Sequence, residues 1–305
     1  MKIYDVIIIG GGPAGYTAAL YSTRAGLDTL LIEKTVPGGQ MATTGAIDNY
    51  PGFDEGIIGF ELAMKMKDGA ERFGAKTEYR EVTELLLDER IKTVVSAGEV
   101  YRAKAVIIAG GADPRKLGVK GEEELLGQGV HYCAHCDGRF YKDGVVAVVG
   151  GGNSALENAV YLSRLAKEVY LIIRDDAPRA SKVYMDKIPE LKNVRVIKNT
   201  TVGEIEKLDS KILVKLASGA EGGELLLDGL FVSVGRTPAT GLYRGLLSLD
   251  ENSYIIADES TKTSVPGVFA AGDIRTKELR QIVTATSDGA VAAYQAENYI
   301  LSLKN

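Results

Sequence analysis

The chain has 305 residues, of which 45% are hydrophobic and 25% are charged, and its formal net charge is -5 at pH 7. This length accommodates two domains that each bury a core, and the composition is that of an ordinary globular protein. The mildly negative charge argues against a nucleic acid or an anionic membrane as a partner. No apolar run is long enough to span a bilayer, and because a strand pattern begins at residue 3 we expect no signal peptide.

The N-terminal segment carries a dinucleotide-binding pattern. Residues 3–9 form a continuous apolar run, which is typical of a parallel strand buried on both faces. Gly10-Gly-Gly12-Pro-Ala-Gly15 follows and opens a helical pattern to about Gly26, and a second apolar strand ends at Glu33. A G-x-G-x-x-G turn between a strand and a helix lets backbone amides approach a pyrophosphate at the helix N-terminus. Glu33 is the acid expected to accept hydrogen bonds from the ribose.

The following segment is less specific. Polar, glycine-rich turns lie at Pro37–Gln40 and at residues 48–52, and helical spacing over residues 56–73 predicts a helix with Phe60 in the core. Short alternating runs over residues 75–103 predict a small antiparallel meander. Residues 105–109 are expected to form a separate buried strand.

The glycine pattern returns in the second half of the chain. Residues 145–149 form an apolar strand, Gly150-Gly-Gly152-Asn-Ser-Ala155 is the turn, and a helix is expected to about Lys167. Two such units predict two dinucleotides, and a duplicated fold with one inactive site is the alternative. Further strands are expected over residues 194–234, a linker over 236–245, a short strand over 267–273 and a long helix over 283–303.

The only two cysteines lie in His131-Tyr-Cys133-Ala-His135-Cys136-Asp137. A Cys-x-x-Cys pair closes a small ring with little backbone movement and can cycle between dithiol and disulfide. As a structural cross-link it would contribute little, because the loop is so short. Zinc bound by the two cysteines and two histidines, and an inert thiol pair, are the alternatives. One cysteine pair without an export signal favours a catalytic role in the reducing cytoplasm.

With both glycine turns and the Cys-x-x-Cys just upstream of the second, the chain resembles the low-molecular-weight thioredoxin reductases of bacteria and archaea. The resemblance implies an α/β fold of two Rossmann-like, three-layer dinucleotide-binding domains, the second inserted into the first. The FAD-binding domain is then discontinuous, with residues 1–113 and 243–305. The NAD(P)H-binding domain, residues 114–242, carries the Cys-x-x-Cys.

The resemblance also implies site residues. Those implied for FAD are Gly10, Gly12, Pro13, Ala14, Gly15, Glu33, Lys34, Gly39, Gln40, Asn49, Val82, Ala109, Gly110, Asp273, Arg280, Gln281 and Ile282. Those implied for the nicotinamide cofactor are Gly150, Gly152, Asn153, Ser154, Arg174, Asp175, Arg179 and Gly235. In the redox motif Cys136 lies against the flavin, Cys133 attacks the partner disulfide and Asp137 is the acid. No metal is expected.

The implied reaction passes electrons from NAD(P)H through FAD and the dithiol to the disulfide of thioredoxin or a thioredoxin-like protein. The implied assembly is a homodimer in the cytoplasm. A reductase of another disulfide carrier, such as a peroxiredoxin-linked module, and an enzyme reduced by ferredoxin are alternatives. A flavin-binding redox sensor without turnover is the alternative from outside enzymology.

One segment departs from the family. Where many members read His-Arg-Arg-x-x-x-Arg, this chain reads Ile173-Arg174-Asp175-Asp-Ala-Pro-Arg179. Asp175 follows Ala155 by 20 residues, where an acid normally bonds the ribose 2′-hydroxyl and repels a 2′-phosphate. Arg174 and Arg179 attract that phosphate unless they pair with Asp175 or Asp176. The motif therefore favours NADH or dual use over NADPH alone.

Overall fold

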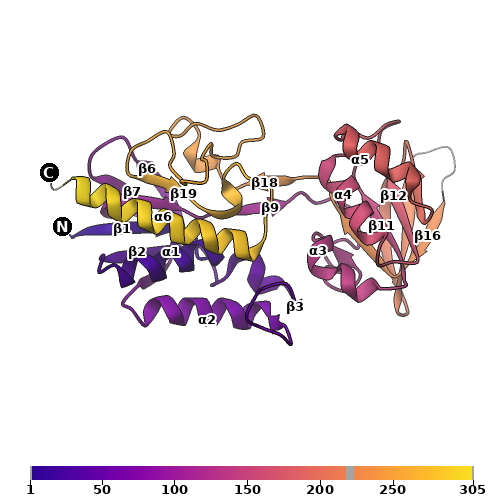
Figure 1. The fold of residues 1–305 in the computed structure, drawn as a ribbon, viewed down its shortest axis with the longest axis horizontal. Helices are drawn as coiled ribbons and strands as arrows, with labels where there is room; N and C mark the ends of the chain where they lie inside the picture. The colour runs from indigo at the N-terminus through magenta and orange to yellow at the C-terminus, as the bar shows by residue number, and fades with distance from the viewer. Residues whose placement is uncertain (1, 218–222, 304–305) are drawn as a thin grey trace. The chain divides into compact units, whose positions relative to one another are not determined.

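The computed structural model describes residues 2–217 and 223–303, which form two compact units. The first unit comprises Met1–Asp113 and Thr237–Asn305, and the second is the continuous segment Pro114–Arg236 inserted between them (Figure 1). The two connecting segments, β9 (Ala112–Pro114) and β18 (Arg236–Pro238), pair as a two-stranded sheet. The second connection is thus a strand followed by a turn of 3-10 helix, η4 (Gly241–Tyr243), where the sequence indicated only a linker.

The first unit is built on a seven-stranded sheet in the order β5-β2-β1-β8-β7-β6, with β19 also paired to β8. The strands are β1 (Ile3–Ile9), β2 (Thr29–Glu33), β5 (Lys76–Tyr79), β6 (Val82–Leu86), β7 (Lys92–Ser96), β8 (Glu99–Ile108) and β19 (Val268–Ala270). A small hairpin joins β3 (Ala46–Ile47) to β4 (Ile57–Ile58). The parallel strands β1, β2, β8 and β19 end at one edge of the sheet, where the glycine turn lies.

Helices cover one face of this sheet. They are α1 (Pro13–Arg24), α2 (Gly59–Glu71) and α6 (Ile282–Ser302), and α1 contacts both of the others (Figure 1). Short 3-10 turns are η1 (Gly39–Thr43) and η5 (Gly272–Ile274). One apolar core lies between α1, α6 and the sheet, and a second lies on the opposite face under the 243–257 segment. Helices, sheet and this second covering make three layers, and the second half of β1, from Val6 to Ile9, is apolar because both its faces are buried.

Three expectations in this unit are wrong. Residues 76–79 are not part of the meander, because β5 pairs parallel with β2. The separate strand expected at 105–109 is the second half of β8, whose first half pairs antiparallel with β7 and whose second half pairs parallel with β1. Phe60 is 53% exposed, because Leu62 and Ala63 occupy the buried face of α2.

The second unit repeats the three-layer plan around a five-stranded parallel sheet in the order β10-β17-β11-β12-β13. These strands are β10 (Val130–His131), β17 (Gly229–Val232), β11 (Val145–Val149), β12 (Glu168–Ile172) and β13 (Val194–Ile197). One face packs against α4 (Asn153–Leu162) and α5 (Lys182–Lys187). The redox motif contains α3 (Ala134–Asp137), and η2 (Gly138–Tyr141) follows it directly. A short η3 (Ile188–Glu190) follows α5. The other face packs against an antiparallel sheet of β14 (Thr201–Leu208), β15 (Lys211–Ala217) and β16 (Glu224–Leu227).

The helix that follows the second glycine turn is shorter than predicted: α4 ends at Leu162 rather than near Lys167. Within the described residues 2–217 and 223–303, no helix is long and apolar enough to cross a membrane.

Candidate active site

The β1–α1 turn of the first unit has the geometry of a phosphate-binding loop. Gly10 has φ +105°, and a Cβ there would collide with the carbonyl oxygen of Ala109. A Cβ at Gly15 would collide with the Gly10 carbonyl oxygen, so only glycine lets α1 approach β1 this closely. Gly12 is the N-cap of α1 and has no side chain that could bond the free amides, which leaves the first amides of the helix for a ligand.

Space for that ligand is present at Gly12. A Cβ on Gly12 would meet no atom within 4 Å, and one on Gly39 would meet only the Gly12 Cα, at 3.7 Å. The two glycines therefore face each other across an open cradle that a side chain would fill. Pro13 and Ala14 follow in the first turn of α1, with Pro13 at a position where a missing N–H costs nothing.

Glu33 ends β2 beside this loop and is 9% exposed. One carboxylate oxygen, Oε2, accepts a hydrogen bond from the Gly11 amide at 2.6 Å, and Oε1 accepts from the Thr35 amide at 2.9 Å. These two bonds fix the carboxylate at the carboxyl end of the strand. Each oxygen has a further lone pair, so the carboxylate can accept from a sugar hydroxyl as well.

Other predicted FAD residues lie on neighbouring strand ends and turns. Ala109 and Gly110 follow β8, and Ala109 lies against Gly10. Asp273 lies in η5 directly after Gly272, and a Cβ at Gly272 would be 3.0 Å from the Ala14 side chain. The structure thus brings these residues, which the resemblance assigns to FAD, to the same edge of the sheet as the β1–α1 turn.

The loop before α6 also carries predicted flavin contacts. Asn49 donates to the Gln281 side chain at 3.0 Å, and Gln281 forms a capping box with Thr284 that begins α6 at Ile282. Gln40 in η1 donates to the Ala112 carbonyl at 2.5 Å. Arg280 stacks over the Tyr254 ring at 4.2 Å, and its Nε is buried without a hydrogen-bond partner among the described residues. An unsatisfied buried donor and an open glycine cradle fit a missing polar cofactor such as FAD.

Two predicted contacts have other partners in the structure. The Lys34 ammonium forms an exposed ion pair with Glu81 at 2.7 Å. Val82 opens β6 and packs against the apolar core. Their part in cofactor binding stays a prediction.

A buried ion cluster supports the turn at Asp273. Asp288 of α6 is 3% exposed and accepts hydrogen bonds from the Gly272 amide at 2.9 Å, from Arg275 Nε at 2.8 Å and from Lys277 at 2.7 Å. Burial by itself raises the pKa of Asp288, but the bonds from Arg275, Lys277 and the Gly272 amide outweigh it and hold that pKa below its ordinary value. The cluster therefore fixes Gly272 and, through the chain, the adjacent Asp273.

The β11–α4 turn of the second unit has the same form. Gly150 has φ +143°, and Gly152 caps α4 without a side-chain bond and would accommodate a Cβ without contact. Asn153 accepts from the Ser181 amide at 2.6 Å, whereas Ser154 is exposed in the first turn of α4. Gly235 lies after β17, and its carbonyl accepts from the Arg115 amide at 3.0 Å.

Arg174, Asp175 and Arg179 lie together just beyond β12. The Arg179 amide donates to the Gly151 carbonyl at 2.6 Å, which ties this segment to the glycine turn. Both guanidinium groups lie near the Asp175 carboxylate, with Arg179 Nη2 at 2.8 Å and Arg174 Nε at 3.6 Å. All three side chains are substantially exposed, so they are accessible to a nucleotide.

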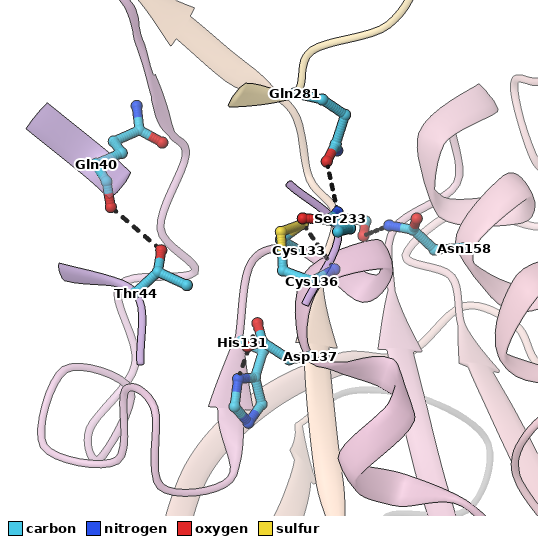
Figure 2. The surroundings of a disulfide bond; sticks show 10 residues. Gln40, Thr44, His131, Cys133, Cys136, Asp137, Asn158, Ser233 and Gln281 are labelled. Carbon is cyan, nitrogen blue, oxygen red and sulfur yellow. Dashed lines mark hydrogen bonds and ion pairs between the residues drawn. A yellow bond between two sulfur atoms is a disulfide. The ribbon is translucent and has the colours of Figure 1, made fainter. Parts of the chain in front are cut away.

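In the redox motif Cys133 and Cys136 are joined by a disulfide with a Cα–Cα distance of 5.3 Å (Figure 2). Cys133 is the N-cap of α3, and its sulfur accepts a hydrogen bond from the Cys136 amide at 3.1 Å. A donor held against this sulfur stabilises it as a thiolate when the disulfide is reduced.

The residues before Cys133 are anchored on both sides. Tyr132 donates a hydrogen bond to Glu122 at 2.8 Å. Burial raises the pKa of Tyr132, and the hydrogen bond and negative charge of Glu122 raise it further. Glu122 is 1% exposed and also accepts from the amides of Leu117 and Gly118. The redox motif therefore leaves β10 at a fixed position.

Asp137 ends α3 next to Cys136, and its Oδ2 lies 3.2 Å from Nδ1 of His131 (Figure 2). Nε2 of His131 lies 2.5 Å from the Tyr141 hydroxyl. Among the described residues no group of three or more His, Cys, Asp or Glu side chains is arranged to hold a metal ion.

The structure contains two dinucleotide-binding turns and a redox-capable Cys-x-x-Cys pair. Comparison with known proteins identifies the family. The family model for pyridine nucleotide-disulphide oxidoreductases matches residues 4–289. This chain belongs to that family.

Relatives in this family match almost the whole chain. The thioredoxin reductase of Listeria innocua is 50% identical over 306 aligned residues, which cover 99% of this chain and 96% of the relative. That of Bacillus subtilis is 46% identical over 307, with the same coverage. The crystal structure of thioredoxin reductase from Streptococcus pyogenes matches with a TM-score of 0.92 at 44% identity and covers 98% of this chain and 99% of that chain.

In this pyridine nucleotide-disulphide oxidoreductase, the sequence pattern does not identify three polar residues that the structure places in or beside the site: His131, Tyr141 and Asp288. The sequence marks His131 only as one possible zinc ligand, and it indicates no role for Tyr141 or Asp288. His131 precedes Cys133 by two residues, so on an extended segment it shares a side with Cys133, and that spacing is a usable signal. Asp288 interrupts an otherwise apolar face of the last helix, which also marks it as paired.

Proposed function

We propose that this chain is a flavoprotein thioredoxin reductase that passes electrons from NADH or NADPH through FAD and the Cys133–Cys136 pair to the disulfide of thioredoxin. The observation that carries this proposal is the closed Cys-x-x-Cys ring, which lies in a unit that also contains a dinucleotide turn. Thioredoxin reductases match the chain over nearly all its length.

FAD is held by the β1–α1 turn and Glu33, with Gln40, Asn49, Asp273 and the Arg280–Ile282 segment toward the flavin. When bound, FAD accepts a hydride from the nicotinamide and supplies two electrons to the disulfide. The open cradle at Gly12 and the unpaired Arg280 Nε support this assignment.

The dithiol then transfers the electron pair to thioredoxin by two exchanges. The Cys133 thiolate attacks one sulfur of the thioredoxin disulfide, so that a mixed disulfide forms and one thioredoxin thiolate leaves. The Cys136 thiolate attacks Cys133 Sγ, which restores the ring and releases the second thiolate. The hydrogen bond from the Cys136 amide to Cys133 Sγ supports Cys133 as the attacking thiol.

Two protons must reach the departing thioredoxin thiolates, and the two enzyme thiols give up the same number. Asp137 is the proton carrier in this proposal, since it directly follows Cys136 and is only partly exposed.

NADH, or both nucleotides, is the proposed electron source. The two arginines that would attract a 2′-phosphate are paired with Asp175, which supports a weakened preference for NADPH. We also propose a cytoplasmic location, where a dithiol is kept reducible, and a homodimer. Exposed Ile58 and Phe60 at the start of α2 are apolar groups that a second copy could cover.

The purified protein tests the proposal directly. NADH or NADPH should bleach the flavin absorbance anaerobically, and oxidised thioredoxin should restore it. Cys133→Ser should still accept electrons into the flavin, but should reduce thioredoxin slower by about a thousandfold, because the attacking thiol is gone.

Two parallel assays separate the alternatives. Reoxidation by a peroxiredoxin-type disulfide but not by thioredoxin would replace the proposed partner. Flavin reduction by ferredoxin but by neither nucleotide would replace the proposed electron source. Normal thioredoxin reduction by Cys133→Ser would contradict the dithiol mechanism.

A further inference from the structure

His131 is a buried polar residue that the proposed electron path leaves without a role. It ends β10, is 7% exposed, and has Phe231 of β17 stacked on its ring at a centroid distance of 5.4 Å. Tyr141 of η2 packs edge-on at 5.3 Å. These two aromatic contacts hold the imidazole in one orientation.

Both ring nitrogens face polar groups in that orientation. Asp137 of α3 lies at Nδ1 and Tyr141 lies at Nε2, and Phe231 brings no charge. An ionised carboxylate only accepts hydrogen bonds, so the contact with Asp137 suits the tautomer that carries its proton on Nδ1. Nε2 then accepts from the Tyr141 hydroxyl.

The phenol is suited to donate. Burial raises the pKa of Tyr141 to about 12, and the negative charges of Asp137 and Asp228 contribute further. Tyr141 therefore keeps its proton at neutral pH, and the order Tyr141–His131–Asp137 gives each imidazole nitrogen a polar neighbour.

We propose that His131 is a positioning residue of dithiol exchange, which holds the Asp137 carboxyl beside Cys136 and shares with it the proton that moves during exchange. This inference rests on the role proposed for Asp137. In each exchange one sulfur–sulfur bond breaks and one forms. The His131–Asp137 pair accepts a proton from an enzyme thiol and returns it to the departing thioredoxin thiolate, so no other reactant is needed.

Five variants of the FAD-containing protein test the inference: two at His131, one control, Asp137→Asn, and the double variant of His131→Phe with Asp137→Asn. His131→Phe keeps the aromatic packing but has no donor, and His131→Asn keeps an N–H near the position of Nδ1 but does not titrate. Tyr170→Phe is the control, because Tyr170 is another partly buried aromatic residue of the same parallel sheet, in β12, but packs into the core on the face that carries β14–β16. The readouts are kcat and KM for oxidised thioredoxin from pH 5.5 to 9, with FAD content and Tm as measures of folding.

We expect His131→Phe to lower kcat about tenfold at pH 7 with little change in the KM for thioredoxin. His131→Asn should recover most of that rate, while the midpoint of its pH profile moves by about one unit. Tyr170→Phe should keep the wild-type profile. Asp137→Asn should lose at least as much as His131→Phe, and the double variant should lose no more than Asp137→Asn alone, since His131 acts through Asp137.

The outcomes separate the two claims. If Asp137→Asn is slow but both His131 variants keep the wild-type rate and pH profile, the inference is overturned and the proposed function stands. If Asp137→Asn itself is unimpaired, the role proposed for Asp137 fails first. If His131→Phe binds less FAD or has a lower Tm, the pH profile of His131→Asn decides between a structural and a proton-sharing role. An unshifted profile in His131→Asn would contradict a shared proton.

Discussion

Asp175 is the residue on which the proposed nucleotide preference depends. Its carboxylate lies beyond β12, where a nucleotide ribose is expected, and it pairs with Arg179 and Arg174. In the proposed function this single aspartate acts twice against a 2′-phosphate, by its own charge and by engaging the two guanidinium groups that would attract one. Exposed ion pairs of this kind are weak, so Asp175 reduces the attraction of the two arginines for a phosphate without abolishing it, and removal of the aspartate restores that attraction in full.

Asp175→Asn should accordingly shift the nucleotide preference toward NADPH. We expect the ratio of kcat/KM for NADPH to kcat/KM for NADH to rise about tenfold, which corresponds to about 1.4 kcal/mol. Steady-state kinetics with both nucleotides measure it. Asp176→Asn is the control, because Asp176 is exposed and its nearby partner is Asn199, at 3.5 Å. An unchanged ratio in Asp175→Asn, or an equal rise in Asp176→Asn, would refute the assignment.

At the scale of elements, α6 stabilises the flavin-side edge of the sheet through one buried carboxylate. Asp288 joins α6 to the turn at Gly272, and it neutralises Arg275, which is 1% exposed. Arg275 also donates to Glu259 and to the backbone carbonyls of Ala257 and Thr276. Removing the Asp288 charge would leave buried cations without their main partner.

We expect Asp288→Asn to lower the free energy of unfolding at pH 7 by about 3 kcal/mol and to weaken FAD binding. Because the pKa of Asp288 is lowered in the folded state, the charge contributes stability that is present above the ordinary carboxyl pKa and is lost as pH falls through the folded pKa. The difference between variant and wild type should therefore shrink in acid. Urea unfolding at pH 7 and in the acid range, with flavin fluorescence, measures both effects.

Glu297→Gln, a carboxylate later in the same helix, is the control for that experiment. It should change stability by less than about 0.5 kcal/mol. A loss in Asp288→Asn that stays constant down to strong acid would contradict the ion-pair account, because it would show that the charge of Asp288 is not the source.

At the scale of the whole molecule, the two units differ in how their cores are assembled. Both apolar cores of the second unit consist of residues between Leu125 and Val232. The two large cores of the first unit combine the N-terminal strands with residues after 237, including Phe269 and the apolar face of α6. The inserted unit thus has a complete core within one continuous segment.

The fragment Pro114–Arg236 should therefore fold by itself. We expect one cooperative urea transition, with a free energy of unfolding on the order of 5 kcal/mol. Met1–Asp113 alone should not fold, since β8 would lack β19 and the helical face would lack α6. Circular dichroism of both fragments measures this, and a non-cooperative Pro114–Arg236 fragment would contradict the division.

The sequence by itself determined both glycine turns, their strands and helices, and the redox pair. Each of these depends on residues close in the chain, where spacing alone dictates a backbone shape: Gly10 to Gly15 must turn, and Cys133 can reach Cys136. It also indicated the family and the unusual Asp175. It could not show that β8 is one strand with two kinds of neighbour, because the pairing of residues 99–108 with β7, β1 and β19 depends on segments far apart in the chain.

Only the tertiary structure placed the Tyr141 hydroxyl against His131 and His131 against Asp137, and only it buried Asp288 with Arg275. A polar side chain has no periodicity that names its partner. Its hydrogen bonds are decided when packed strands and helices bring it out of water beside one group rather than another, and the cost of leaving it unpaired there then fixes the pair.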